Sequence, residues 1–253
     1  MKERKKRKNN VFALLGKDIS YSFSRGYFSK KFKKLGLENY EYINLDLPKI
    51  EEFPVAIKEI SGLKGINVTI PYKQDIFSFL DKVDKTARRI GAVNTIKFTK
   101  KGHLKGYNTD VFGFENSLKP LLKKHHKRAL ILGTGGASKA IAYVLKKNNI
   151  KYKFVSRFPK GKKDISYNDV SGKILKKHQI IINCTPIGTS PNIEKSPNIP
   201  YQFITKNHLL YDLIYNPTET AFLAKGKEKG ATIKNGLEML ELQAEKSWEI
   251  WNS

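Results

Sequence analysis

The chain has one cysteine, few arginines and no long apolar run, and each of these absences excludes a class of protein. A single cysteine, Cys184, cannot form an internal disulfide or make a zinc site by itself. No other cluster of metal ligands stands out, so no metal is expected. No apolar run approaches the roughly 18 residues that a membrane-spanning helix needs, and the charged N-terminus lacks the apolar region of a secretion signal. The sequence therefore predicts a soluble cytoplasmic protein with no membrane partner.

Positive charge greatly exceeds negative charge, with 48 lysines and arginines against 23 acids and a formal net charge of +25. Only seven of these cations are arginines, and the lysines are spread along the chain. The pattern favours a compositional origin, such as drift toward A+T-rich codons, over a nucleic-acid surface, since zinc-finger spacing and an aromatic-rich RNA-binding motif are missing. The dense run Lys2–Lys8 predicts a disordered basic tail over 1–10. The histidines His125, His126 and His178 stand in lysine-rich turns and are expected to be solvated rather than catalytic.

Strand-like apolar runs alternate with helix-like segments along the chain. Strands are expected at 11–15, 40–45, 65–70, 129–132, 153–156, 180–184 and 209–214. Helices are expected at 50–60, 75–80, 137–147 and 237–251, and another follows Asp110 between the two halves. This alternation predicts an α/β fold with mostly parallel sheets covered by helices. The length fits one large or two modest domains.

A glycine-rich segment stands between a predicted strand and a predicted helix, where a dinucleotide-binding loop belongs. It reads Gly133, Thr134, Gly135, Gly136, Ala137, Ser138. Gly133 permits a tight turn, and Gly135 lets the backbone approach a pyrophosphate. The helix that follows offers free N–H groups and a partial positive charge.

The choice between NAD and NADP rests on the end of the next strand. NAD-binding proteins place an acid there, about 20 residues after the loop, to bind the ribose 2′-hydroxyl. Residues 154–158 contain no acid but include Ser156 and Arg157, and Arg157 can pair with a 2′-phosphate or stack on adenine. Lysines follow at 160, 162 and 163, although they also fit a solvated loop. NADP is therefore the predicted cofactor.

Hydroxyl, amide and charged residues cluster after the strands of the first half, in segments 20–24, 67–73, 91–95 and 106–110. In open α/β sheets ligands bind beyond the carboxyl ends of the strands. These residue types suit a small polyhydroxylated acid.

From about Phe12 to Trp251 the chain resembles the shikimate dehydrogenase family. The motifs that carry the resemblance are the segments 22–24, 67–73, 91–95, 106–110, 133–138, 183–188, 212–217 and 235–240, followed by Gln243. Their order and spacing are together very specific. The first motif departs from the family pattern, because Arg25, Phe28 and Ser29 replace its usual proline and His-Asn. Phe158 and Lys85 are further departures.

The resemblance implies reversible NADPH-dependent reduction of 3-dehydroshikimate to shikimate, on the route to chorismate and the aromatic amino acids. It implies Lys73 and Asp110 as the catalytic pair. The substrate contacts it implies are Ser22, Ser24, Thr69, Asn94, Tyr215 and Gln243. The NADP contacts it implies are Gly133, Thr134, Gly135, Gly136, Ala137, Ser156, Arg157, Leu213 and Gly236, with Leu213 (or Ile214) and Gly236 beside the nicotinamide.

The family fold implies an N-terminal α/β substrate domain and a Rossmann-like, doubly wound NADP domain. Segments 11–110 and 237–253 are assigned to the former and 111–236 to the latter, with the C-terminal helix returning to the substrate domain and bringing Gln243 to the site. Lys73 is the ionisable group that can both carry positive charge and donate a proton, so it is expected to be the general acid in reduction. Asp110 would orient it.

Alternatives remain: an NAD-dependent quinate/shikimate dehydrogenase, a basic nucleic-acid-binding relative, and a catalytically inactive relative. The missing acid after Val155 argues against the first, and the intact pair Lys73 and Asp110 argues against the other two. The expected partners are small molecules, without specific nucleic acid, bound by a monomer or homodimer.

Overall fold

The computed structural model describes residues 10–20, 22–162 and 164–253, so the basic tail predicted for 1–10 lies outside the described residues except for Asn10. The chain divides into two compact units. The first runs to Thr109 and includes Ala244–Ser253, and the second is Asp110–Gln243. In the described part of the chain, no helix combines the length and apolar character needed to cross a membrane.

The first unit contains a six-stranded sheet with the order β2-β1-β3-β5-β6-β4. Its strands are β1 (Asn10–Gly16), β2 (Tyr40–Asp46), β3 (Leu63–Val68), β4 (Lys82–Val83), β5 (Thr95–Phe98) and β6 (Leu104–Tyr107). The first three strands are parallel, as the alternation predicts. The hairpin of β5 and β6 was not predicted, and β5 runs antiparallel to both β3 and β6.

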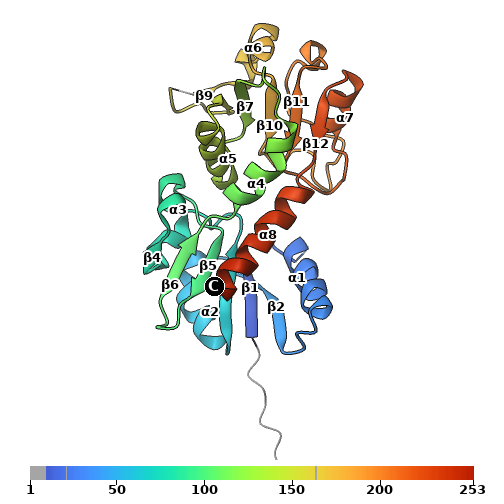
Figure 1. Cartoon of the computed structure of the whole chain (residues 1–253). Coiled ribbons are helices and arrows are strands. Elements are labelled where there is room, and N and C mark those ends of the chain that lie inside the picture. The colour runs from blue at the N-terminus through green and yellow to red at the C-terminus, as the bar shows by residue number, and fades with distance from the viewer. Residues whose placement is uncertain (1–9, 21, 163) are drawn as a thin grey trace, which may run out of the picture. The chain divides into compact units, whose positions relative to one another are not determined.

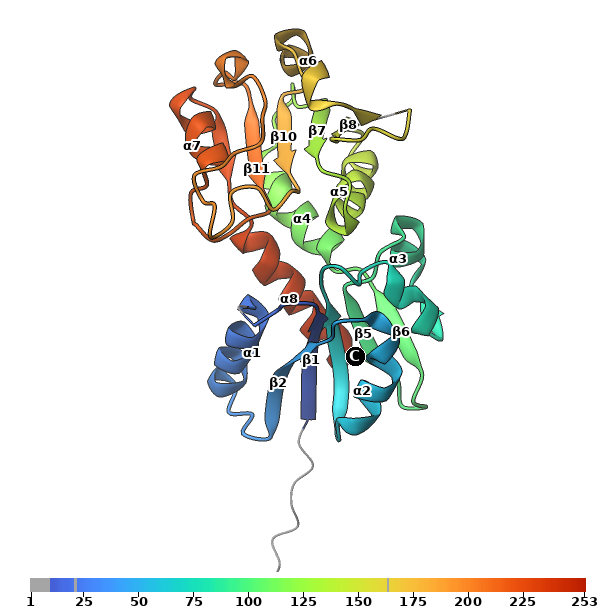
Figure 2. The same ribbon diagram turned by 180° about the vertical axis from the view of Figure 1, so that it is seen from behind.

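Helices cover both faces of this sheet, and Figures 1 and 2 show α1 and the end of α8 over one face and α2 over the other. The elements are α1 (Phe23–Lys34), the 3₁₀ turn η1 (Ile50–Glu52), α2 (Phe53–Glu59), the 3₁₀ turn η2 (Asp75–Phe79) and α3 (Lys85–Ile90). The helix predicted at 75–80 is present as the five-residue 3₁₀ helix η2. Segments this short favour the tighter turn.

The C-terminal helix α8 (Leu237–Asn252) begins in the second unit and ends in the first, which confirms the helix predicted at 237–251. Its Trp251 packs against Phe12 at a ring distance of 4.8 Å and donates its indole N–H to the Ile96 carbonyl at 3.0 Å. A Cβ on Gly65 would overlap the Trp251 ring. Glycine at position 65 of β3 therefore allows α8 to lie directly on the sheet.

The second unit contains a six-stranded, wholly parallel sheet with the order β12-β11-β10-β7-β8-β9. Its strands are β7 (Arg128–Leu132), β8 (Lys151–Val155), β9 (Asp164–Ile165), β10 (Ile180–Asn183), β11 (Leu209–Asp212) and β12 (Thr232–Lys234). This is the strand order of the doubly wound dinucleotide-binding fold. Figure 2 shows β11, β10, β7 and β8 side by side.

Buried apolar residues lie on both faces of this sheet, as expected where helices cover both sides. Ile180, Ile181 and Ile182 of β10 are all fully buried, and they alternate between the two core clusters. The covering elements are α4 (Asp110–Leu118), η3 (Lys119–Leu121), α5 (Gly136–Lys147), η4 (Tyr167–Asp169), α6 (Gly172–Lys177), η5 (Tyr201–Phe203) and α7 (Ala221–Glu228).

The expectation that the histidines of this unit are solvated is wrong for His126 and His178, which are 4% and 5% exposed. Each has a protein partner: His126 accepts the Lys123 N–H on Nδ1 at 3.0 Å, and the Nδ1–H of His178 donates to the Ile174 carbonyl at 2.8 Å. The buried His208 accepts the Thr205 N–H at 3.0 Å and donates from Nε2 to the Leu175 carbonyl. Because lysines surround His126 and His178 in the sequence, their roles in capping turns could not be predicted.

Acid should destabilise the protein through these histidines. Burial lowers the pKa of His126, His178 and His208 from the ordinary value of 6.5. Below that value the unfolded chain binds protons that the folded chain resists, so stability is complete above about pH 6.5 and falls as the pH drops. We expect Tm to fall between about pH 7.5 and pH 5.5, by roughly 2–4 °C for each kcal/mol lost. His208→Gln should flatten this dependence, and an unaltered slope would contradict the assignment.

Candidate active site

The glycine-rich loop lies where the order of the second sheet reverses, after the central strand β7. Its neighbour β10 continues into Cys184, whose N–H donates to the Leu132 carbonyl at 2.9 Å. Gly133 has φ of 99°, a left-handed conformation that favours glycine, and a Cβ there would lie 3.0 Å from Thr185 Cγ2. Ligands bind at such a switch point in doubly wound sheets.

The start of α5 is open and carries no side-chain cap. Its N-cap is Gly135, which makes no side-chain capping bond, and the first turn contains no acid. A Cβ built on Gly135 meets nothing within 4 Å, and Thr134 and Gly135 lie at the surface. The 12-residue helix thus presents its first N–H groups and its positive end to open space. Gly136 and Ala137 are its first residues, so the predicted loop has the geometry of a phosphate site.

The residues predicted to select NADP follow β8. Arg157 is exposed, and its charge acts on Tyr167, where it opposes the rise in pKa that burial causes. The Ser156 hydroxyl accepts the Phe158 N–H at 3.1 Å, which turns the chain after the strand. Phe158 is an exposed aromatic side chain that follows Arg157.

Sequence reasoning missed one acid close to this loop. Asp164 of β9 lies in register with Phe154, and its carboxylate accepts the N–H groups of Lys160 and Gly161 at 3.0 and 2.9 Å. The acid therefore holds the lysine-bearing loop rather than replacing the acid that NAD-binding proteins carry at the end of the preceding strand.

The residues predicted beside the nicotinamide meet at the ends of β11 and β12. The Gly236 N–H donates to the Ile214 carbonyl at 2.9 Å, and a Cβ on Gly236 would overlap the Leu213 carbonyl. Tyr215 is half-buried in the same loop. The structure thus places Leu213 and Tyr215, which follow β11, beside Gly236, which follows β12, in the second unit.

In the first unit, the two serines lie at the start of α1. Ser22 is the N-cap, and its hydroxyl accepts the Ser24 N–H at 3.2 Å. Burial raises the pKa of Tyr42, and the nearby Ser24 side chain lowers it by a smaller amount. The Tyr42 hydroxyl donates to Asn67 Oδ1 at 2.8 Å.

This chain of hydrogen bonds continues to the predicted substrate residue Asn94, which is 2% exposed. Asn67 Nδ2 donates to Ser247 Oγ at 2.9 Å, and Ser247 is 2.8 Å from Thr95 Oγ1. Asn94 Oδ1 accepts the Thr109 N–H at 2.7 Å, and its amide donates to the Thr109 hydroxyl. Asn94 therefore fixes the residue that directly precedes Asp110.

Sequence reasoning did not assign roles to Tyr42, Asn67 or Ser247 in this network. A tyrosine in a strand predicted to be buried needs a partner for its hydroxyl, which is a usable signal for Tyr42. Ser247 is a polar residue on a helix face that includes Ala244 and Trp251, and it too could have been noticed.

The predicted acid Lys73 lies on the segment after β3. Thr69 donates its N–H to the Leu15 carbonyl at 2.8 Å, and its methyl group occupies the space that a Cβ on Gly16 would need. The Lys73 carbonyl accepts the Val93 N–H at 2.8 Å, so the backbone of Lys73 lies beside the segment that carries Asn94. The Lys73 side chain is half-buried. The structure thus brings Thr69, Lys73, Asn94 and the serines into one unit.

Asp110 is the first residue of α4 and is 5% exposed. One turn later, a Cβ on Gly113 would lie 3.1 Å from Gln243 Cβ and would overlap the Met239 carbonyl. This close approach of α4 and α8 places Gln243, 9% exposed, against the first turns of α4 in the second unit. The absence of a side chain at Gly113 permits this close approach of the two helices.

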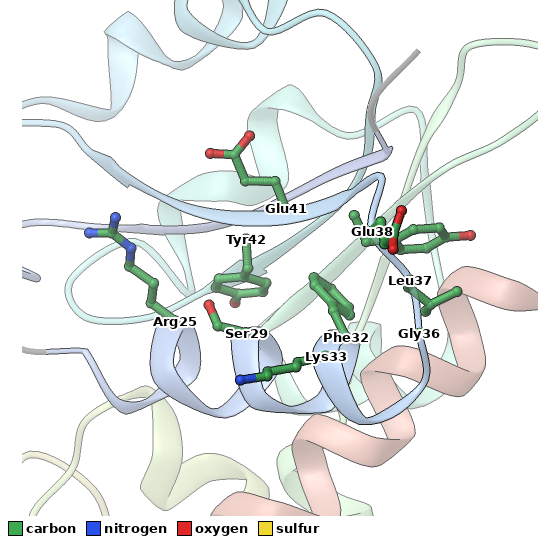
Figure 3. Close-up of a pocket in the computed structure, with 10 residues that line it drawn as sticks. Arg25, Ser29, Phe32, Lys33, Gly36, Leu37, Glu38, Glu41 and Tyr42 are labelled. Atoms are coloured by element: carbon green, nitrogen blue, oxygen red, sulfur yellow. The ribbon is translucent and has the colours of Figure 1, made fainter. Parts of the chain in front are cut away.

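A pocket of about 520 Å³ between α1 and β2 contains none of the predicted site residues. Figure 3 shows Arg25, Ser29 and Lys33 on one side of it and Glu41 on the other. Arg25, Phe28 and Ser29 are the departures from the family's first motif. Phe28 points into the core and stacks on Tyr42 at 4.6 Å. Lys85, another departure, is exposed at the start of α3.

The parallel sheet with a glycine loop at its switch point, joined to an α/β unit rich in buried hydroxyl and amide groups, defines a two-domain nucleotide-dependent dehydrogenase. Residues 14–96 match the family model described as the shikimate dehydrogenase substrate binding domain. The chain is 39% identical to shikimate dehydrogenase (NADP(+)) of Caldicellulosiruptor saccharolyticus, over 94% of this chain and 90% of that protein. The chain belongs to the shikimate dehydrogenase family.

Solved structures of shikimate dehydrogenases are also similar to this chain. Shikimate dehydrogenase 1 from Peptoclostridium difficile is 41% identical with a TM-score of 0.84, covering 96% of this chain and 91% of that one. The enzyme of Thermus thermophilus, solved with NADP(H) and shikimate, is 31% identical with a TM-score of 0.83, covering 95% and 92%. These matches confirm the predicted family and the predicted two-part α/β fold.

Proposed function

We propose that this chain catalyses the reversible, NADPH-dependent reduction of 3-dehydroshikimate to shikimate. The observation that carries the proposal is the buried network from Tyr42 through Asn67 and Asn94 to Thr109, in a chain similar to NADP-dependent shikimate dehydrogenases over 94% of its length. Such a network presents hydroxyl and amide groups in fixed positions, as recognition of a polyhydroxylated acid requires.

The substrate-binding role is assigned to segments 11–110 and 237–253 and the nucleotide-binding role to 111–236, and this assignment stays a prediction. Ser22 and Ser24 are proposed to donate to the substrate carboxylate, with Tyr215 assisting. Thr69, Asn94 and Gln243 are proposed to bind the ring hydroxyls.

Lys73 is proposed as the general acid of the reduction. Its ammonium group stabilises the oxyanion that forms on the carbonyl oxygen and then donates the proton; in the reverse direction the amine accepts it. Asp110, as a carboxylate, orients the ammonium group and bonds a ring hydroxyl. Neither step requires a metal.

NADPH, when bound, supplies the hydride. The N–H groups at Gly135, Gly136 and Ala137 are proposed to bind its pyrophosphate, and Gly133 and Thr134 to shape the turn. Ser156 and Arg157 are proposed to bind the 2′-phosphate. Leu213 and Gly236 are proposed to border the nicotinamide through their backbone.

We further propose that the enzyme acts in the cytoplasm, where NADPH and a reduced Cys184 are both maintained, as a monomer or homodimer. The proposal is tested by following formation of the reduced cofactor, NADPH or NADH, from shikimate with NADP or NAD, and from quinate with either cofactor. Turnover of shikimate with NADP should exceed the other three rates. Faster turnover of quinate with NAD would favour the quinate/shikimate dehydrogenase alternative.

A compositional origin of the +25 charge predicts weak binding to duplex DNA. Non-specific phosphate contacts lose affinity steeply with salt, so binding at low salt should fall by about 10³-fold or more between 50 and 200 mM salt. Fluorescence anisotropy with two unrelated duplexes measures this. Sequence-selective binding that persists at the higher salt would promote the nucleic-acid-binding alternative.

A further inference from the structure

Asp212 is a completely buried carboxylate at the end of β11 that has no place in the mechanism above. Its Oδ1 accepts the Asn183 amide at 3.1 Å and the Ile214 N–H at 3.0 Å, and its Oδ2 accepts the Thr220 hydroxyl at 2.7 Å. All three donors are neutral. Because Asp212 is 0% exposed, any influence on the reaction must pass through these partners.

These hydrogen bonds fix both ends of the loop 213–220. Ile214 stands at its start, and Thr220 at its end is the N-cap of α7, where its hydroxyl also accepts the Leu223 N–H. Between them lies Tyr215, and the Ile214 carbonyl accepts the Gly236 N–H. One carboxylate therefore determines the path of the backbone that bears the proposed nicotinamide and substrate contacts.

The same carboxylate reaches the glycine loop through Asn183. Asn183 Oδ1 accepts the N–H and the hydroxyl of Thr185 at 3.0 and 2.7 Å. Thr185 Cγ2 in turn lies 3.0 Å from the position that a Cβ on Gly133 would occupy. The ends of β7, β10 and β11 are thus connected at Asp212 and its amide partner.

We propose that Asp212 is a positioning residue that, as a carboxylate, holds the loop 213–220 in register with the glycine loop, so that Tyr215 and the nicotinamide end of the cofactor meet the substrate in one arrangement. This inference rests on the proposed function of the site. Asp212 touches no ligand, but it would align the groups between which the hydride is transferred. This alignment matters because small misplacements of reacting groups lower the rate steeply.

The electrostatic surroundings of Asp212 make its positioning role depend on pH. Burial raises the pKa of Asp212 to about 6, although its three hydrogen bonds lower it. The titratable groups that face it are Cys184 and Tyr201; burial raises the pKa of both, and the charge of Asp212 raises them further. Glu219, in the loop that Asp212 holds, pairs with Lys227 of α7 at the surface. Protonation of Oδ2 would turn this acceptor into a donor, so the bond with the Thr220 hydroxyl would have to reverse, and the loss of negative charge would weaken the two bonds that Oδ1 accepts.

Asp212→Asn tests the proposal, because asparagine keeps the size and one acceptor oxygen but cannot accept the Thr220 hydroxyl at its amide nitrogen. We expect kcat for shikimate oxidation to fall about 10- to 100-fold. The wild-type rate of 3-dehydroshikimate reduction, for which Lys73 must be protonated, should fall on the acid side of about pH 6, and this acid limb should be absent in the variant. Affinity for 2′,5′-ADP, which carries only the adenosine end of NADP, should stay within about twofold.

Matched variants separate positioning from stability. Glu115→Gln makes the same change at another buried carboxylate, which pairs with Lys147 and Lys119, and should lower Tm without altering kcat or the acid limb. Thr220→Val should reproduce the loss in Asp212→Asn, and Thr220→Ser, which keeps the hydroxyl, should restore most of it.

The proposal is overturned if Asp212→Asn keeps wild-type kcat and its acid limb, or if 2′,5′-ADP affinity falls in proportion to kcat. Should the wild-type enzyme fail to oxidise shikimate, the proposed function fails. The positioning role is then judged by binding alone: weaker NADP binding with unchanged 2′,5′-ADP binding supports it, and equal loss of both contradicts it.

Discussion

Lys73→Ala should lower kcat by about 10²–10⁴-fold, the usual contribution of general acid–base catalysis, and by more if oxyanion stabilisation is lost with it. Shikimate binding should weaken much less, because the serines, Asn94 and Gln243 remain. Steady-state rates in both directions, with KM and kcat determined separately, make the measurement. Lys64→Ala, which removes an exposed lysine from β3 of the same unit, is the matched control and should leave kcat unchanged.

Asp110→Asn should also reduce kcat, because an amide cannot balance the ammonium charge of Lys73. If the two residues act as one unit, the loss in the double variant should be far smaller than the product of the single losses. A Lys73→Ala enzyme with an intact circular dichroism spectrum and near wild-type kcat would refute the assignment. A rise in KM alone would make Lys73 a binding residue and leave the proton to Asp110 or an ordered water.

Arg157→Ala should raise the apparent KM for NADP by roughly ten- to a hundredfold while leaving turnover with NAD nearly unchanged. A charge-assisted hydrogen bond contributes roughly 1.5–3 kcal/mol, and each 1.4 kcal/mol is about a factor of ten. The NAD molecule lacks the 2′-phosphate, so it has no such contact to lose. Competition by 2′,5′-ADP against NADP measures the effect directly.

Arg128→Ala is the control for this experiment, since it removes an exposed arginine at the start of β7, at the opposite end of the same sheet. It should leave both cofactors unaffected. Equal losses with NADP and NAD in Arg157→Ala would show that this arginine only shapes the turn after β8, and would remove the main argument for cofactor selection.

The parallel strands β1, β7 and β10 could be predicted because their sequences contain continuous apolar runs, whereas β9 and β12, of two and three residues, could not. Residues 129–132 and 180–182, buried on both faces of the second sheet, are examples. The hairpin of β5 and β6 could not be predicted, because each strand has only four residues and includes a lysine, Lys97 or Lys105. Thr95, Gly106 and Tyr107 belong to motifs that were interpreted as ligand-binding turns, and the same residues also form the sheet.

The residues of the site also divide into those that could be predicted from the sequence and those that could not. Asn94, Lys73 and the glycine loop could be identified because each stands in a local motif whose chemistry is evident. The contact between Asn67 and Ser247 joins residues separated by 180 positions, and no local pattern predicts such a pairing. Asp212 stands in a motif that was noted, but its role depends on Thr220 and Asn183, which the fold brings to it from two other segments.

The central claim is tested most directly by the reaction in the reductive direction. Purified enzyme is mixed with 3-dehydroshikimate and NADPH, the loss of NADPH absorbance is followed, and the product is identified by nuclear magnetic resonance. The account predicts stoichiometric formation of shikimate and NADP, with much slower consumption of NADH. Absence of shikimate from a folded enzyme that binds NADPH would contradict it.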